Sequence, residues 1–127
     1  MTAPISEQPV SRRPLRIDWP RTGAVRVARF GGSCTMDQSS LVAEELTPVA
    51  IDAGVRVVVL DLGDLDFIES SGLGGVIAAY LKCRKRGGEF RIASPQSNIR
   101  RVLQITRLDQ LFPIFDTVDA ALAGLPA

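Results

Sequence analysis

The chain has 127 residues, of which 46% are hydrophobic, and its 15 basic and 14 acidic residues leave a formal net charge of +1. This length is typical of one domain, and the balanced charge predicts no general attraction to nucleic acid or to an anionic membrane. The chain contains no histidine, and its two cysteines, Cys34 and Cys83, lack the spacing of metal ligands. We therefore expect no metal site, no cofactor and no histidine general base.

The compartment is predicted from the lack of any targeting signal in the sequence. No apolar run approaches the ~20 residues of a transmembrane helix, and the N-terminus lacks the apolar stretch of a secretory signal. We expect a cytoplasmic protein without membrane insertion, in which both cysteines are reduced. A redox switch between Cys34 and Cys83 is the minor alternative, and it requires their α-carbons to lie within ~7 Å.

The first part of the chain predicts a tail and a hairpin. Residues 1–13 are expected to form a flexible tail, because they include two prolines and almost no large apolar side chain. Residues 14–127 are expected to form a single domain. Alternating apolar residues over 15–19, and again from Val25, are typical of two strands joined as a hairpin. The pair Gly31-Gly32 is predicted to end the second strand.

A helix and a central strand are expected next. Asp37 or Ser39 is positioned to cap the helix, which should end before Gly54. The nearly continuous aliphatic run over residues 55–62 predicts a strand that is covered on both faces. A polar loop over residues 63–66 is predicted to follow that strand.

The strongest helix signal runs from residue 73 to residue 81, where apolar side chains recur at helical spacing. A basic last turn and Gly87-Gly88 supply its end. Four shorter elements are expected after it: a strand at Phe90 and Ile92, a helix over 95–103, a strand at Ile114-Phe115 and a helix capped by Thr117. Because strands alternate with helices and the first two strands form a hairpin, we predict an α/β or α+β domain with a mixed sheet.

The segment Glu69-Ser70-Ser71-Gly72-Leu73 joins the central strand to the strongest helix. Either serine can cap this helix, and the free amides of its first turn tolerate negative charge. The residues alone leave two interpretations: an ordinary cap with packing glycines, or a phosphorylated serine that controls a docked partner. Nucleotide binding is a weaker alternative, because GxxxxGK[ST] is absent. Nothing in the spacing specifies a base for a catalytic serine, so no enzyme is expected.

Several motifs follow one another with the order and spacing of a known family. They are Val58-Val59-Leu60-Asp61-Leu62, the run from Phe67 to Gly74, Arg86-Gly87-Gly88, Ser94-Pro95 and the run from Val102 to Leu108. Over about Leu15 to Leu122 the chain resembles the STAS-domain family, specifically the bacterial anti-anti-sigma factors, also called anti-sigma factor antagonists. The resemblance implies the STAS fold, an α/β (α+β-like) domain with a central mixed sheet of four to five strands and helices packed on one side.

The resemblance also implies a function. Members of this type bind a kinase-type anti-sigma factor and thereby release a sigma factor for transcription. The kinase is implied to phosphorylate Ser70, which weakens binding, and a serine phosphatase acting on the phosphorylated form restores it. The implied partner-binding residues are Thr35, Asp66, Glu69, Ser70, Ser71, Gly72, Leu73 and Gly74. No direct contact with nucleic acid is implied.

Three positions depart from the family pattern. Glu69 stands where the family commonly has aspartate, and Thr35 stands where it has an acid, unless Asp37 substitutes after a shift. Arg107 stands where glycine is usual, and it would be strained if the backbone there were left-handed. The first two departures motivate an alternative, a non-phosphorylated STAS scaffold or accessory subunit of a transport or stress-signalling complex. A small nucleotide-binding protein is the remaining alternative.

Overall fold

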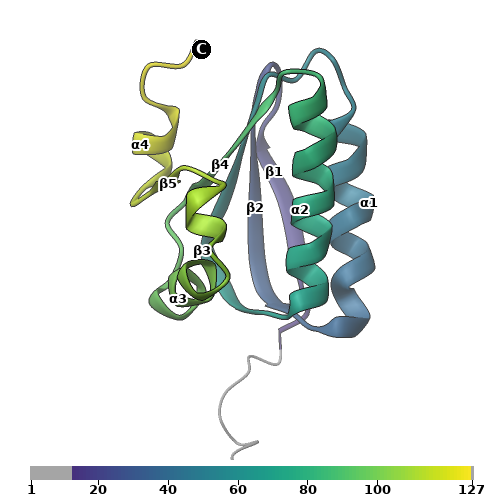
Figure 1. The fold of residues 1–127 in the computed structure, drawn as a ribbon, viewed down its shortest axis with the longest axis vertical. Helices are drawn as coiled ribbons and strands as arrows, with labels where there is room; N and C mark the ends of the chain where they lie inside the picture. Colours follow the sequence, from purple (N-terminus) through teal and green to yellow (C-terminus); the bar gives the residue numbers. More distant parts are fainter. Residues whose placement is uncertain (1–12, 127) are drawn as a thin grey trace, which may run out of the picture.

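One five-stranded sheet forms the centre of the protein (Figure 1). The computed structural model describes residues 13–126, so the predicted tail, apart from Arg13, lies outside the described residues. The strands follow one another across the sheet in chain order: β1 (Arg16–Arg21), β2 (Val25–Cys34), β3 (Val57–Ile68), β4 (Glu89–Ala93) and β5 (Ile114–Phe115). β1 and β2 pair antiparallel, and the other neighbours pair parallel. The predicted mixed sheet is confirmed.

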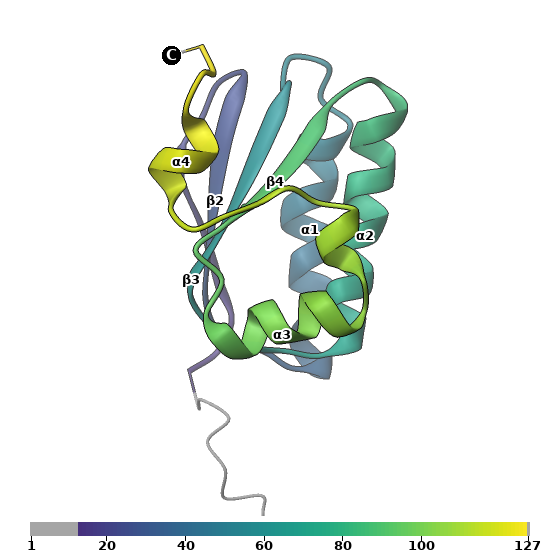
Figure 2. The same cartoon turned by 60° about the vertical axis from the view of Figure 1, so that its left-hand side comes forward.

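Three helices share one core with the sheet. They are α1 (Ser39–Ala50), α2 (Ser70–Lys85) and α3 (Ser97–Ile105), and two 3-10 turns, η2 (Met36–Gln38) and η3 (Leu108–Gln110), accompany them. α1 and α2 lie side by side, and α3 lies at the end of the sheet where α2 begins (Figure 1, Figure 2). These three helices confirm the expected fold class.

The short helix α4 (Val118–Leu122) lies on the other face of the sheet, away from α1 and α2 (Figure 2). Its Ala121 packs in a second apolar cluster with Val57 and Val59 of β3. The alternate β3 residues Val58 and Leu60 belong to the core under α1, α2 and α3. Side chains alternate between the faces of a strand, so a strand covered on both faces needs apolar residues at every position. The continuous aliphatic sequence of β3 meets that need.

β2 continues through Gly31-Gly32, so the prediction that these glycines end the strand was wrong. Gly32 has a φ of +83°, and a Cβ atom there would lie 2.1 Å from the carbonyl oxygen of Pro14. The chain that leads into β1 therefore crosses β2 where only glycine leaves room. The register of pairing with β3 shifts at this point, which accommodates the unusual backbone.

β3 likewise continues through residues 63–66, where a polar loop was predicted. Asp64 and Leu65 still pair with Gly31 and Gly32 of β2, whereas pairing with β4 ends at Asp61. Beyond Asp61 this part of β3 is therefore paired with β2 alone. An edge of this kind tolerates polar side chains, and for that reason its sequence resembles a loop.

α1 forms as predicted, but neither predicted residue caps it. Its N-cap is Gln38, which makes no side-chain capping bond. The Asp37 carboxylate instead accepts a hydrogen bond from Thr35 Oγ1 at 2.7 Å, and Ser39 Oγ donates to the Met36 carbonyl at 2.8 Å. Because η2 precedes the helix, these side chains bond within the 3-10 turn.

The end of α2, the start of α4 and the backbone at Arg107 agree with the sequence analysis. Gly87 adopts a φ of +87° directly after α2, as expected for a helix stop. Thr117 caps α4, and its side chain accepts a hydrogen bond from the Ala120 N–H at 3.0 Å. Arg107 has a φ of +63°, so the position that usually holds glycine is indeed left-handed.

Candidate functional site

The ends of β2 and β3 form the framework of the candidate site. The two strands run parallel, and their last residues, Cys34 and Ile68, are paired. The Glu69 N–H then donates to the Cys34 carbonyl at 2.9 Å. The turn into α2 and the 3-10 turn η2 therefore lie next to each other at one end of the sheet (Figure 1). In α/β folds, the carboxyl ends of parallel strands are where binding sites usually form.

α2 begins with Ser70 and Ser71, and both residues are exposed. Neither serine is the cap. The N-cap is Glu69, whose backbone carbonyl accepts hydrogen bonds from the N–H groups of Gly72 and Leu73 at 3.0 and 3.1 Å, with no side-chain capping bond. Both hydroxyls are therefore left available at the positive end of a 16-residue helix.

The glycines of the motif differ in their surroundings. A Cβ atom on Gly72 would lie 2.5 Å from Cys34 Sγ, and one on Gly75 would lie 3.1 Å from Cγ1 of Val42. These two glycines let α2 lie close to β2 and to α1. Gly74 is exposed and has no atom within 4 Å of the same position. Since all three lie inside α2, they do not form the phosphate-cradling loop that the nucleotide-binding alternative requires.

Two carboxylates lie on the two turns at this end of the sheet. Asp37 lies on η2, and the hydrogen bond from the Thr35 hydroxyl, helped by its own backbone, lowers the pKa of the Asp37 carboxyl. Glu69 is half-buried, and its negative charge adds to the effect of burial in raising the pKa of the Cys34 thiol to about 11. Within residues 13–126 no ion pair is formed by Asp37 or Glu69. The structure thus brings a carboxylate into contact with Thr35, where the resemblance expects an acid.

Asp66 has a different environment from the other predicted site residues. Its carboxylate accepts a hydrogen bond from Arg13 Nη2 at 2.7 Å and one from Gln96 Nε2 at 3.4 Å, and its backbone carbonyl accepts one from Asn98 Nδ2 at 2.7 Å. Arg13 also pairs with Asp64. Asp66 therefore ties the chain entering β1 and the start of α3 to the end of β3.

The predicted partner-binding residues divide by exposure. Ser70, Ser71 and Gly74 are exposed, whereas Gly72 and Leu73 are buried beneath them. Thr35, Asp66 and Glu69 are half-buried. The exposed members lie on the surface of the candidate site, and Gly72 and Leu73 pack beneath that surface.

Sequence reasoning missed Met36, whose side chain is 68% exposed in η2. It also treated Asp37 mainly as a helix cap. The signal that identifies both residues is topological: when two parallel strands are neighbours, the residues that follow them meet at one edge of the sheet. That rule requires the pairing of β2 with β3, which the sequence alone does not specify.

The two cysteines do not form a switch. Both are buried and free. Cys34 contacts Gly72 near the start of α2, whereas Cys83 lies eleven residues further along the same helix, a rise of about 16 Å. This separation exceeds what a disulfide can span, so the minor alternative of a bridge between Cys34 and Cys83 is excluded.

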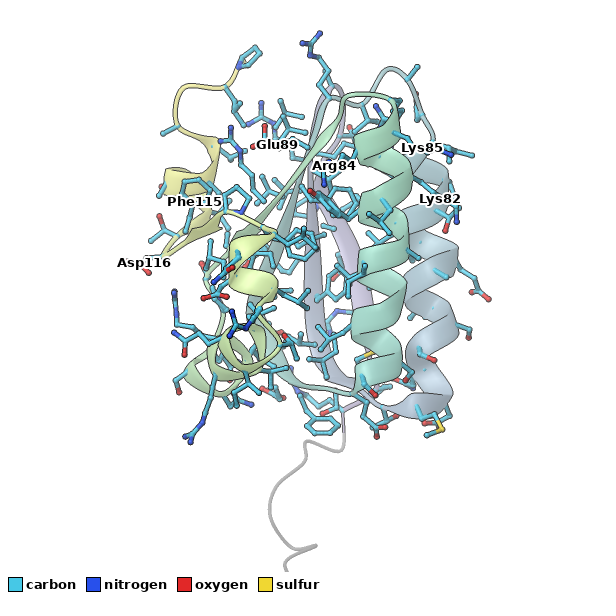
Figure 3. The ribbon with its side chains drawn as sticks, in the orientation of Figure 1. Lys82, Arg84, Lys85, Glu89, Phe115 and Asp116 are labelled. Atoms are coloured by element: carbon cyan, nitrogen blue, oxygen red, sulfur yellow. The ribbon has the colours of Figure 1, made fainter. Side chains whose placement is uncertain are left out.

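The opposite end of the sheet has a cavity and the basic last turn of α2. A cavity of about 540 Å³ lies there, lined in part by Val25, Arg56, Arg86 and Leu125, and none of the predicted site residues lines it. Lys82, Arg84 and Lys85 project from the last turn of α2 at the same end (Figure 3). They complement the negative end of the helix dipole.

The described residues contain no group of three or more histidine, cysteine, aspartate or glutamate side chains that could hold a metal ion. No helix in residues 13–126 has the length and apolar character to cross a bilayer.

Comparison with known proteins identifies the family. The family described as STAS domain matches residues 16–121. An anti-sigma F factor antagonist from Paenibacillus polymyxa is 27% identical over 111 residues, which cover 87% of this chain and 95% of that protein. The crystal structure of an anti-sigma factor antagonist from Mycobacterium paratuberculosis superposes with a TM-score of 0.79 at 26% identity, covering 91% of this chain and 97% of that one. The fold is also that of the Bacillus cell fate determinant SpoIIAA in its phosphorylated form, which superposes with a TM-score of 0.69 at 18% identity. That alignment covers 88% of this chain and 99% of the SpoIIAA chain. The chain therefore belongs to the STAS domain family.

Proposed function

We propose that the chain is a cytoplasmic anti-sigma factor antagonist. In this role it binds a kinase-type anti-sigma factor through the start of α2 and the adjoining η2, and the sigma factor that the kinase had held is released for transcription. The observation that carries the proposal is the exposed Ser70 at the first position of α2, at the edge of a STAS domain. The names of the two antagonists that match the chain over most of its length support the same role.

Ser70 is the proposed phosphate acceptor. Ser70 is exposed, and its N–H and that of Ser71 have no acceptor within the helix. A phosphate there carries about −1.5 to −2 charges, which the helix dipole accepts without unfolding α2. Ser71 is the neighbouring alternative, and the resemblance selects Ser70.

Phosphorylation would weaken binding by electrostatics. Ser70 would enter the kinase active site, where nucleotide phosphates and the carboxylates that hold Mg²⁺ carry negative charge. A phosphate on Ser70 would be repelled by those groups, and desolvating it in the interface would add to the cost. A serine phosphatase that removes the phosphate would restore binding.

The remaining predicted residues have distinct proposed roles. Glu69, Ser71 and Gly74 would contact the partner, and Thr35 would act by holding the Asp37 carboxylate in place. Gly72 and Leu73 would support the surface from below, because both are buried. Asp66 would contribute by fixing the strand end that leads into the turn.

A phosphorylation assay tests the proposal. The chain is incubated with ATP, Mg²⁺ and each kinase-type anti-sigma factor encoded in the same genome, and the phosphate is mapped by mass spectrometry. We expect one kinase to modify wild-type protein and Ser71→Ala, but not Ser70→Ala. Modification of Ser70→Ala at another residue would refute the acceptor assignment.

The same assay distinguishes the proposed antagonist role from the scaffold alternative. A kinase that binds without transferring phosphate would leave an antagonist that is not switched at Ser70. If no candidate binds, and affinity isolation recovers transport components or larger STAS proteins instead, the antagonist role is wrong.

A further inference from the structure

We propose that Met36 is the apolar anchor of the docking surface, and that the partner meets it with an apolar pocket rimmed by cationic side chains. The inference rests on the proposed function and specifies the chemistry of that partner. Met36 is a large apolar residue, yet 68% of it is exposed. It belongs to η2, which contacts the start of α2.

The position of Met36 follows from strand pairing. Cys34, two residues earlier, is paired with Ile68 and accepts a hydrogen bond from the Glu69 N–H at 2.9 Å. The chain therefore leaves β2 next to the turn that carries Ser70. The other exposed large apolar residues of the described part are Ile51, Leu81 and Ile105. Ile51 follows α1 at the end opposite to η2, about 18 Å along that helix.

The charges around Met36 indicate which charge the partner's surface carries. Asp37 follows it directly, and its carboxylate is oriented by the 2.7 Å hydrogen bond from Thr35. Glu69 lies on the neighbouring turn, and neither acid has a cationic partner within residues 13–126. By contrast, Asp64 and Asp66 on β3 are both paired with Arg13. Two acids without an ion pair in the described part of the chain, Asp37 next to Met36 and Glu69 on the neighbouring turn, therefore belong to this surface, which makes it complementary to arginine or lysine on a partner.

A methionine suits this position because its unbranched, polarizable side chain adapts to the shape of a pocket. Methionine is enriched at protein interfaces, where a few central residues carry most of the binding free energy. The cationic rim would engage Asp37 and Glu69 at the periphery. Ser70 would reach the negatively charged centre of the kinase site. The cationic rim that attracts Asp37 and Glu69 and the negative groups that repel a phosphate on Ser70 would therefore lie at different places on the kinase.

Calorimetric titration of the kinase that modifies Ser70 tests the inference, with ADP present so that no phosphate is transferred. Met36→Ala should weaken binding by about tenfold or more, and Met36→Leu should retain most of the affinity. Ile51→Ala is the matched control, because Ile51 is 61% exposed at the far end of α1, and it should bind as wild type does. All three variants should keep the wild-type melting temperature, since they alter exposed side chains.

The cationic rim of the partner is tested by measuring how the binding affinity in the same titration depends on salt. The double variant Asp37→Asn, Glu69→Gln should bind more weakly at low salt and lose much of the salt dependence, whereas the exposed Glu44→Gln should retain it. Equal affinity of wild type and Met36→Ala, or an unchanged salt dependence of the double variant, would overturn this inference while leaving the proposed function intact. A wild-type chain that binds no kinase would overturn both.

Discussion

Cys34 and Gly72 are in such close contact that a Cβ atom built on Gly72 would lie 2.5 Å from Cys34 Sγ. Cys34 is fully buried at the end of β2, so the sulfur lies within the core and not at the surface. We expect Gly72→Ala to destabilise the fold by about 1–3 kcal/mol, which is the usual cost of overpacking a core. Urea unfolding followed by the fluorescence of Trp19 would measure the change.

Gly74 provides the matched control for this experiment. It lies two residues further along α2, and a Cβ there would meet no atom within 4 Å. Gly74→Ala should stabilise the protein by up to about 1 kcal/mol, because alanine has the higher helix propensity. If both substitutions change the unfolding free energy equally, the contact between Cys34 and Gly72 is not what selects glycine. The double variant Cys34→Ala, Gly72→Ala should recover part of the lost stability.

The glycine motif shows how far the sequence could predict the site. Spacing placed Ser70 and Ser71 at the start of a helix, and the aliphatic run of β3 fixed the strand before it. The role of Gly72 depends on Cys34, which is 38 residues away in the sequence, so local pattern could not reveal it. Met36 was missed for the same reason, because its proximity to Ser70 arises from the pairing of β2 with β3.

The two failed strand boundaries have a common cause. Glycines and acidic residues usually mark loops, and here they lie within β2 and over residues 63–66 of β3. Gly32 is required because the Pro14 carbonyl crosses the strand. Asp64 is tolerated because that part of β3 is not paired with β4. Both features are tertiary, and tertiary contacts override local propensity.

Glu69 is the N-cap of α2 but makes no side-chain capping bond. Aspartate is among the preferred N-cap residues, because its shorter side chain reaches the N–H groups of the second and third helical residues. We expect Glu69→Asp to stabilise the protein by about 0.5–1 kcal/mol. Thermal unfolding of Glu69→Asp beside Glu69→Ala measures the effect. If both variants melt alike, the capping explanation fails.

Thr35 stabilises the ionised form of Asp37. The hydrogen bond from its hydroxyl lowers the pKa of the Asp37 carboxyl in the folded protein. A lowered folded-state pKa contributes stability above the unfolded-state pKa, and the contribution is lost as the pH falls through the folded-state value. Thr35→Val should therefore raise the pKa of Asp37 toward its ordinary value, measured by NMR titration. Thr35→Ser, which keeps the hydroxyl, serves as control and should leave the lowered pKa of Asp37 in place.

Arg86 joins the ends of two helices. Its guanidinium donates to the carbonyl oxygens of Ala50 at 2.6 Å and Val49 at 3.2 Å, at the end of α1, and to that of Val55. Lysine cannot reproduce this planar fork of donors. Arg86→Lys should destabilise the protein by about 1–3 kcal/mol, because the Ala50 and Val55 carbonyls lose the guanidinium that donates to them. The exposed Lys85→Arg is the control and should change the unfolding free energy by less than about 0.5 kcal/mol.

Cys34 should make the stability of the protein depend on alkaline pH. Burial, with the charge of Glu69, raises the pKa of its thiol from 9.0 to about 11 in the folded protein. The unfolded chain loses this proton first, so the contribution is complete below pH 9 and is lost as the pH rises through about 11. Melting temperatures at pH 8 and pH 10 should therefore differ more for wild type than for Cys34→Ala. For the same reason the native thiol should resist iodoacetamide at pH 8 and react once urea unfolds the chain, because the thiolate is the nucleophile. Rapid alkylation of Cys34 in the native protein would show that the thiol is not held in its protonated form by burial.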